Sequence, residues 1–109
     1  MPFPPPTGPD GVSQQERIAA AAWCARLGVK WSAEALFNED GSVSLGLISP
    51  RSTGGEFGIL MPTWMVERTV AGYAVVDAAA QEVIGVFPEL NWALWAVIEA
   101  ELRAVANNA

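Results

Sequence analysis

Hydrophobic positions near the C-terminus recur with the spacing of a helix. Four apolar residues share one stripe at about 100° per residue: Leu94, Ile98, Leu102 and Val105. Trp95 lies at the edge of this stripe, and Pro88 suits the first turn of a helix because its missing N–H would have no intrahelical partner there. We therefore predict an amphipathic helix over residues 88–106, whose apolar stripe packs on a small antiparallel sheet and forms the centre of the core.

A second helical pattern starts at Ser13. The run Ser13-Gln14-Gln15-Glu16 matches a capping box, in which the side chains of Ser13 and Glu16 each accept a hydrogen bond from the other residue's N–H. Gly28 can take the left-handed conformation that ends a helix. Two nearly opposite stripes of this helix are apolar: Ile18, Ala22, Ala25 and Val29, and Ala20, Trp23, Cys24 and Leu27. We expect it to be buried on two sides, by the sheet and by either the C-terminal helix or a second copy of the protein.

The next segment alternates like a β-hairpin. Asn38-Glu39-Asp40-Gly41 has the turn residues of a three-residue loop, with Gly where the chain must become left-handed. This turn sets a register with three apolar pairs on one face: Phe37 opposite Val43, Ala35 opposite Leu45, and Ala33 opposite Leu47. The other face takes Ser42, Ser44 and Glu34. Residues 49–55 have the composition of a flexible loop.

Further along the chain, residues 56–61 alternate and stop at Pro62, so we predict a third strand there. Residues 63–70 are ambiguous, since Thr63 could cap a short helix while Thr69 and Val70 favour a strand. We interpret this segment as an irregular approach to the fourth strand.

The β-branched runs at residues 73–77 and 83–87 flank a polar break and predict a second hairpin. A short helix beginning at Asp77 is the competing interpretation, because the three alanines that follow favour helix.

Together these elements predict an α+β fold: an N-terminal helix, an antiparallel meander of four to five strands, and a C-terminal helix packed on one face of the sheet. Residues 1–12 hold five of the eight prolines and are interpreted as a Pro-rich flexible arm. Residues 13–109 are expected to form a single compact domain, which at this length needs no metal or disulfide to support its core.

The net charge, the apolar runs and the single cysteine limit the kinds of partner and the compartment that we expect. Six basic residues against twelve acidic ones give a net charge of −6, which lacks the cationic surface that direct nucleic-acid binding requires. The longest apolar runs, residues 18–25 and 92–98, are far shorter than the roughly 20 residues of a membrane span, so we expect no membrane partner. A single cysteine, Cys24, and an N-terminus without a basic secretory region favour a reduced thiol in the cytoplasm.

The chain contains no histidine, so it lacks the commonest general base and the usual metal ligand. One cysteine cannot supply a zinc site, and Gly54-Gly55 is not followed by the Lys-Ser or Lys-Thr of a phosphate loop. The carboxylates Glu39 and Asp40 are explained by their place in a turn. We therefore predict no catalytic site, no metal and no cofactor.

Five tryptophans are unusual in so short a chain. We expect Trp23 and Trp95 to pack in the core, whereas Trp92 falls on an outward stripe. That stripe is a candidate partner-binding surface: Trp92, Ala96, Glu99 and Arg103. The competing interpretation is that Trp92 folds back over Pro88 or the arm. A second candidate surface lies on the first helix, where Ala20, Trp23, Cys24 and Leu27 could form a homodimer interface.

Three functions follow as hypotheses. The favoured one is a non-catalytic protein-binding module, a small regulator or inhibitor that acts by contact with another protein. The second is an acidic decoy that occupies the nucleic-acid-binding groove of a partner protein, on the strength of the net charge alone. The third is a small carboxylate- or cofactor-dependent enzyme.

Overall fold

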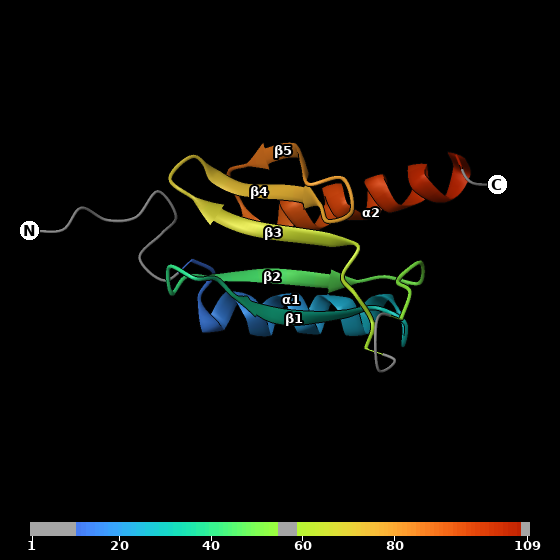
Figure 1. Cartoon of the computed structure of the whole chain (residues 1–109), viewed down its shortest axis with the longest axis horizontal. Coiled ribbons are helices and arrows are strands. Elements are labelled where there is room, and N and C mark those ends of the chain that lie inside the picture. Colours follow the sequence, from blue (N-terminus) through green and yellow to red (C-terminus); the bar gives the residue numbers. More distant parts are fainter. Residues whose placement is uncertain (1–10, 55–58, 108–109) are drawn as a thin grey trace, which may run out of the picture.

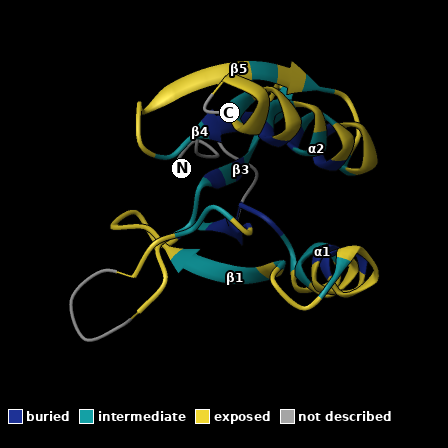
Figure 2. Ribbon diagram, turned by 90° about the vertical axis from the view of Figure 1, so that its right-hand side faces the viewer, coloured by how far each residue is buried: buried dark blue, intermediate teal, exposed yellow. Residues whose placement is uncertain are grey.

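One antiparallel sheet and two helices make up the described part of the chain, residues 11–54 and 59–107 of the computed structural model. The elements follow one another in this order: α1 (Gln14–Leu27), β1 (Ser32–Phe37), β2 (Val43–Ile48), β3 (Trp64–Thr69), β4 (Gly72–Asp77), β5 (Glu82–Phe87) and α2 (Leu90–Asn107). The strands lie side by side in sequence order (Figure 1). Both helices cover the same face of the sheet, and the other face is open (Figure 2). The predicted α+β fold is confirmed.

The first helix, α1, begins at the predicted capping box. The Ser13 N–H donates to Oε1 of Glu16 over 2.9 Å, and the Glu16 N–H donates to Oγ of Ser13 over 3.1 Å. At the other end the N–H of Gly28 donates to the Cys24 carbonyl over 3.3 Å. Gly28 has a φ of 146°, which is positive but outside the left-handed helical region that we predicted.

Within one chain α1 is buried on one side only, so the expected cover by α2 was wrong, and cover by a second copy stays a prediction. Ala20, Trp23 and Cys24 face the core. The opposite stripe is exposed: Ile18, Ala22, Ala25 and Val29. The cause is the spacing of the helices, because α1 packs over β1 while α2 packs over β4 and β5, so neither helix covers the outer side of the other.

The hairpin of β1 and β2 has the predicted register. Its three predicted pairs are present: Ala33 with Leu47, Ala35 with Leu45, and Phe37 with Val43. In the turn, Oδ1 of Asp40 accepts hydrogen bonds from the N–H and the hydroxyl of Ser42, at 2.8 and 2.6 Å, and Gly41 has a φ of 87°. Local turn chemistry therefore sets the register, as expected.

The third strand lies later in the chain than predicted. Within the predicted strand 56–61, residues 56–58 lie outside the described part of the chain, and residues 59–61 form no strand apart from an isolated bridge between Leu60 and Gly54. The strand is β3, in the segment that we interpreted as irregular. There Trp64 and Val66 alternate into the core, because β3 pairs with β2 and β4 and buries both side chains.

The second hairpin, β4 and β5, is confirmed, and the competing short helix at Asp77 is not present. Oδ1 of Asp77 accepts hydrogen bonds from the N–H groups of Ala79 and Ala80, at 3.0 and 3.1 Å, which closes a turn instead of starting a helix. The β5 strand also carries a bulge at Ile84. Val75 pairs with Gly85 and Val76 pairs with Val83, so Ile84 has no partner on β4.

The buried side of α2 is rotated from the predicted stripe. The buried residues are Ala93, Leu94, Val97 and Glu101. Ile98 is half-buried, but Leu102 is 64% exposed and Val105 is exposed as well. The C-terminal half of α2 extends past the ends of the strands (Figure 1), so an apolar stripe continued there has no sheet to face.

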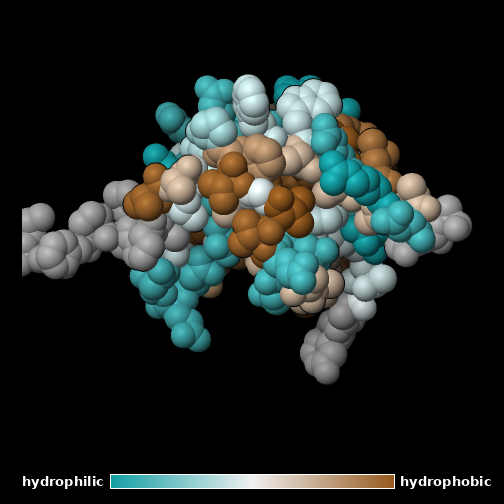
Figure 3. All heavy atoms as spheres, turned by 90° about the horizontal axis from the view of Figure 1, so that it is seen from above, coloured by the Kyte–Doolittle hydropathy of each residue, from teal (hydrophilic) through white to brown (hydrophobic). Residues whose placement is uncertain are grey.

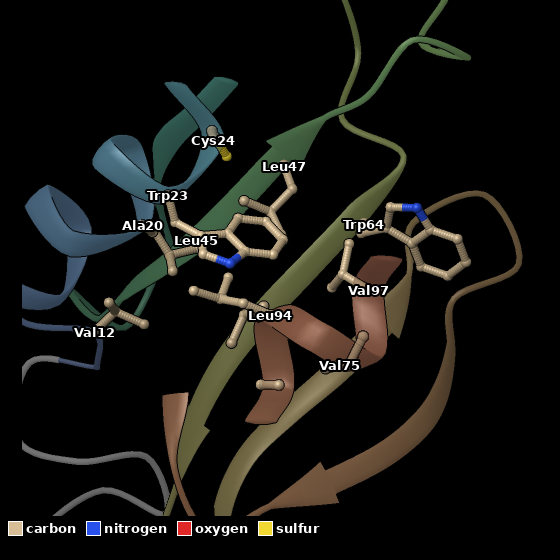
Figure 4. Packing of buried hydrophobic residues seen from close by; sticks show 12 residues of the cluster. Val12, Ala20, Trp23, Cys24, Leu45, Leu47, Trp64, Val75, Leu94 and Val97 are labelled. Carbon is tan, nitrogen blue, oxygen red and sulfur yellow. The ribbon is translucent and has the colours of Figure 1, made fainter. Parts of the chain in front are cut away.

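The core lies between the sheet and the two helices. In Figure 4 the Trp23 ring of α1 lies over Leu45 and Leu47 of β2 and points toward Leu94 of α2, while Trp64 lies beside Val97. This cluster joins both helices to the centre of the sheet.

The core also takes in Val12, the last residue of the predicted arm. Its N–H donates to the Val43 carbonyl over 2.8 Å, and its side chain is buried. Residues 1–10 of that arm lie outside the described part of the chain. In the ranges that are described, no helix is long and apolar enough to cross a membrane.

Candidate protein-binding surface

The outer face of α2 carries two exposed tryptophans. Trp92 is 60% exposed and Trp95 is 62% exposed. They face outward because the same two turns bury Ala93, Leu94 and Val97 against the sheet. The exposure of Trp92 agrees with the predicted outward stripe and shows that Pro88 does not cover its ring. The expected burial of Trp95 was wrong.

All four residues of the predicted outward stripe line one groove of about 340 Å³ between α2 and β5. Its lining comprises Ile84, Phe87, Trp92, Trp95, Ala96, Glu99, Ala100 and Arg103. The small side chains of Ala96 and Ala100 leave the space between the larger ones. We call this the α2–β5 groove.

The charged end of the α2–β5 groove holds an ion pair. Nη2 of Arg103 lies 3.3 Å from Oε2 of Glu99, one helical turn away, and both side chains are at least 70% exposed. Such an exposed pair contributes little to folding stability. Both groups are therefore available to hydrogen-bond with a partner at small cost to the fold.

A second groove, of about 300 Å³, lies between the two helices. Its lining comprises Trp23, Arg26, Leu27, Asn91, Trp95 and Ile98. Trp95 therefore separates the two grooves and borders both. We call this second groove the interhelix groove.

The interhelix groove brings Trp23 and Leu27 into the candidate surface, but not in the predicted way. Ala20, Trp23 and Cys24 are buried in the core, and of these three only Trp23 also lines the groove. The predicted homodimer interface would thus offer a second copy little more than Leu27 and the part of Trp23 that lines the groove, and self-association itself stays a prediction. The Trp23 ring packs edge-on against Trp31, with ring centroids 6.2 Å apart, and only Leu27 of that set is well exposed.

The β5 strand adds apolar surface that sequence reasoning missed. Val83, Ile84 and Val86 are all exposed on this edge strand. Ile84 lines the α2–β5 groove, whereas Val83 and Val86 pair with Val76 and Ala74 on the face away from the helices. Apolar side chains gather in the middle of the view from above (Figure 3). Alternation predicts which strand residues share a face, but it does not reveal which strand ends at the edge of the sheet. The strand order supplies that information.

Ionisable groups elsewhere act as structural contacts. The Tyr73 hydroxyl donates to Oε2 of Glu16, and Nη1 of Arg68 lies 3.4 Å from Oε1 of the same Glu16 carboxylate. Burial raises the pKa of Glu16, but the hydrogen bonds from Tyr73 and Ser13 and the charge of Arg68 outweigh it and hold that pKa below its ordinary value. This cluster joins α1 to β3 and β4.

The thiol of Cys24 and the candidate metal ligands are the remaining groups to consider. Burial raises the pKa of the Cys24 thiol to about 11, so the thiolate needed for nucleophilic attack is scarce at neutral pH. Across residues 11–54 and 59–107, no cluster of three or more His, Cys, Asp or Glu side chains could hold a metal ion.

Comparisons with protein-family models, with curated proteins and with solved structures give no match.

Proposed function

We propose that this protein is a non-catalytic protein-binding module, and that the outer face of α2 is its contact surface. The observation that supports the proposal is the exposure of Trp92 and Trp95, each about 60%, on adjacent turns of one helix. Tryptophan and arginine are the residue types most enriched among binding hot spots. Here Arg103 lies in the same groove as both rings.

The energetic argument rests on the area that a partner could cover. A tryptophan side chain buries on the order of 200 Å² when fully enclosed, and transfer from water is worth about 25 cal/mol per Å². Covering the exposed 60% of one ring therefore contributes about 2–3 kcal/mol. Two such rings contribute about 4–6 kcal/mol, so a micromolar complex, at about 8 kcal/mol net of the cost of association, needs further contacts from the two grooves.

The surface is also preorganised. Ala93, Leu94 and Val97 hold the first turns of α2 against the sheet, and Trp95 stands between two preformed grooves. A rigid anchor loses less conformational entropy on binding than a flexible loop does. The arrangement suits an amphipathic helix or an apolar loop of the partner, whose side chains would enter the grooves on either side of Trp95.

A module of this kind acts by occupying a surface of its partner. We therefore propose a role as a small regulator or inhibitor, in the cytoplasm, where the single thiol of Cys24 stays reduced.

The test is capture of partners from a cell lysate on the immobilised protein, at low and high salt. The double variant Trp92→Ser/Trp95→Ser should lose the captured protein, while Ile18→Ser, a matched change at a side chain 62% exposed on α1, should keep it. Apolar contact should persist at about 1 M salt. If capture is lost at high salt and is the same for the wild type and the double tryptophan variant, the result would support the acidic decoy instead.

A further inference from the structure

A third groove, of about 700 Å³, lies away from the tryptophan surface, where the open face of the sheet meets the segment before β3. Its lining includes Glu34 and Leu36 of β1, Met65 of β3, and the exposed Ile59 and Met61. The described residues just before β3 that line this groove are 59–63. The sheet face opposite the helices lies on the left in Figure 2. We call this third groove the open-face groove.

The floor of the open-face groove is formed where β2 has no side chain. A Cβ atom at Gly46 would lie 3.1 Å from Cγ of Leu36 and 3.2 Å from Cγ of Glu34. Both side chains of β1 therefore lean across the neighbouring strand. Met65 pairs with Gly46 from the other side, so an apolar floor lies directly beside one carboxylate.

The charges in the open-face groove favour a cation. Two carboxylates line it, that of Glu34 on β1 and that of Asp77 at the end of β4, where Oδ1 already accepts from the N–H groups of Ala79 and Ala80. Its described lining holds one basic residue, Arg51, and that guanidinium is already occupied, because Nε and Nη2 lie 3.0 and 2.9 Å from Oε1 of Glu101. Glu34 has no ion-pair partner among residues 11–54 and 59–107.

The strand that supplies Glu34 and Leu36 is an edge strand suited to pairing. All six residues of β1 pair with β2 without a bulge, and within the described residues no strand lies on its other side. Proteins usually protect such edges with charges, proline or bulges. The opposite edge strand has that protection in the bulge at Ile84, whereas β1 has a single charged residue, Glu34.

We propose that β1 and the open-face groove bind an extended peptide segment of a partner protein, in which apolar and cationic side chains alternate. The peptide backbone would pair with the free edge of β1 as a sixth strand. Side chains on the open side would then stand about 5 Å from those of Glu34 and Leu36, so a lysine or arginine meets the carboxylate and an apolar residue meets the leucine. This site is separate from the tryptophan surface and does not depend on its function.

The test uses two labelled eight-residue peptides, one alternating leucine with lysine and one alternating leucine with glutamate, and measures binding by fluorescence anisotropy. The lysine peptide should bind, and the glutamate peptide should bind at least about tenfold more weakly. Glu34→Gln should weaken the lysine peptide about two- to fivefold, as expected for one exposed ion pair. The matched change Glu89→Gln, before α2, should leave affinity unchanged.

Two further measurements separate strand pairing from nonspecific attraction. A lysine peptide methylated on alternate backbone nitrogens should lose binding, because those amides could no longer donate to β1. Amide NMR shifts on binding should map to residues 33–36, Gly46 and Met65. Equal binding of the methylated peptide, equal effects of Glu34→Gln and Glu89→Gln, or no binding by the lysine peptide would overturn the proposal.

The variant Trp92→Ser/Trp95→Ser distinguishes this proposal from the proposed function. It should leave binding of the lysine peptide unchanged. Loss of peptide binding in that variant would place the peptide on α2 and overturn the open-face site.

Discussion

The indole Nε1–H of Trp64 in β3 donates a hydrogen bond over 3.0 Å to Oε1 of Glu101 in α2, and both side chains are buried. The same oxygen, Oε1, also accepts from Nε and Nη2 of Arg51, while Oε2 has no hydrogen-bond partner in the described part of the chain. The guanidinium of Arg51 lies 5.8 Å from the centre of the Trp64 ring. One carboxylate thus joins the second half of α2, the segment after β2, and β3.

We expect Glu101→Ala to lower the free energy of unfolding by about 2–3 kcal/mol, because it leaves the Trp64 N–H buried without an acceptor and Arg51 without its partner. Glu99→Ala is the matched control on the same helix, since it breaks only an exposed pair and should cost less than about 1 kcal/mol. Urea denaturation of both variants measures the difference. Equal losses would mean that the Glu101 contacts contribute nothing beyond those of a surface pair.

The rotation of α2 predicts which leucine supports the core. Leu94 is 1% exposed and Leu102 is 64% exposed, although both belong to the stripe that the sequence pattern suggests. Leu94→Ala should therefore destabilise the fold by about 2–5 kcal/mol. Leu102→Ala should stay within about 0.5 kcal/mol of the wild type. Thermal or chemical denaturation measures the stability of both variants. A larger loss of stability for Leu102→Ala than for Leu94→Ala would contradict the orientation of this helix.

The lowered pKa of Glu16 predicts a dependence of stability on pH. Because this pKa is lower in the folded state than in the unfolded state, the carboxylate stabilises the fold above its unfolded pKa, and that contribution is lost as pH falls through the folded pKa. Glu16→Gln should thus lower the free energy of unfolding at about pH 7. The difference in this free energy between variant and wild type, measured by urea denaturation, should be smaller at about pH 3. A difference of the same size at both pH values would contradict the assignment.

Burial of Cys24 predicts a slow thiol. With its pKa raised to about 11 and its side chain enclosed, Cys24 should react with iodoacetamide at about pH 8 far more slowly in the folded protein than in urea. Ala22→Cys, made together with Cys24→Ala, supplies an exposed thiol on the same helix as a control. Comparable rates for the two folded proteins would show that Cys24 is accessible.

Features set by neighbouring residues could be predicted from the sequence. The capping box of Ser13 and Glu16 closes within one helical turn, and the loop from Asn38 to Gly41 determines the register of its hairpin by local geometry. Both depend on contacts between residues a few positions apart. The α+β architecture followed from the order of such elements.

Features set by distant contacts could not be predicted in this way. The orientation of α2 buries Glu101, which a hydropathy pattern places outside, and its partner Arg51 is 50 positions earlier. The location of β3 is a similar case, because residues 56–61 alternate as well as Trp64 and Val66 do. Pairing with β2 decides between them.

The candidate surface was predicted in part. The helical angle placed Trp92, Ala96, Glu99 and Arg103 together, and they line one groove. The same angle put Trp95 at the edge of the core stripe, and its exposure follows from the rotation of α2. A hydrophobic pattern cannot distinguish an outward tryptophan from a buried one when the helix is apolar on several sides.

Site-specific photo-crosslinking tests the central claim, that α2 is a contact surface, most directly. Benzoylphenylalanine in place of Trp92 keeps an aromatic ring in the α2–β5 groove, and the same group in place of Ile18 stands at a similarly exposed position on α1. We expect irradiation in cells to yield an adduct with a second protein from position 92 and none from position 18. No adduct from position 92, or the same adduct from both positions, would contradict the assignment of this surface.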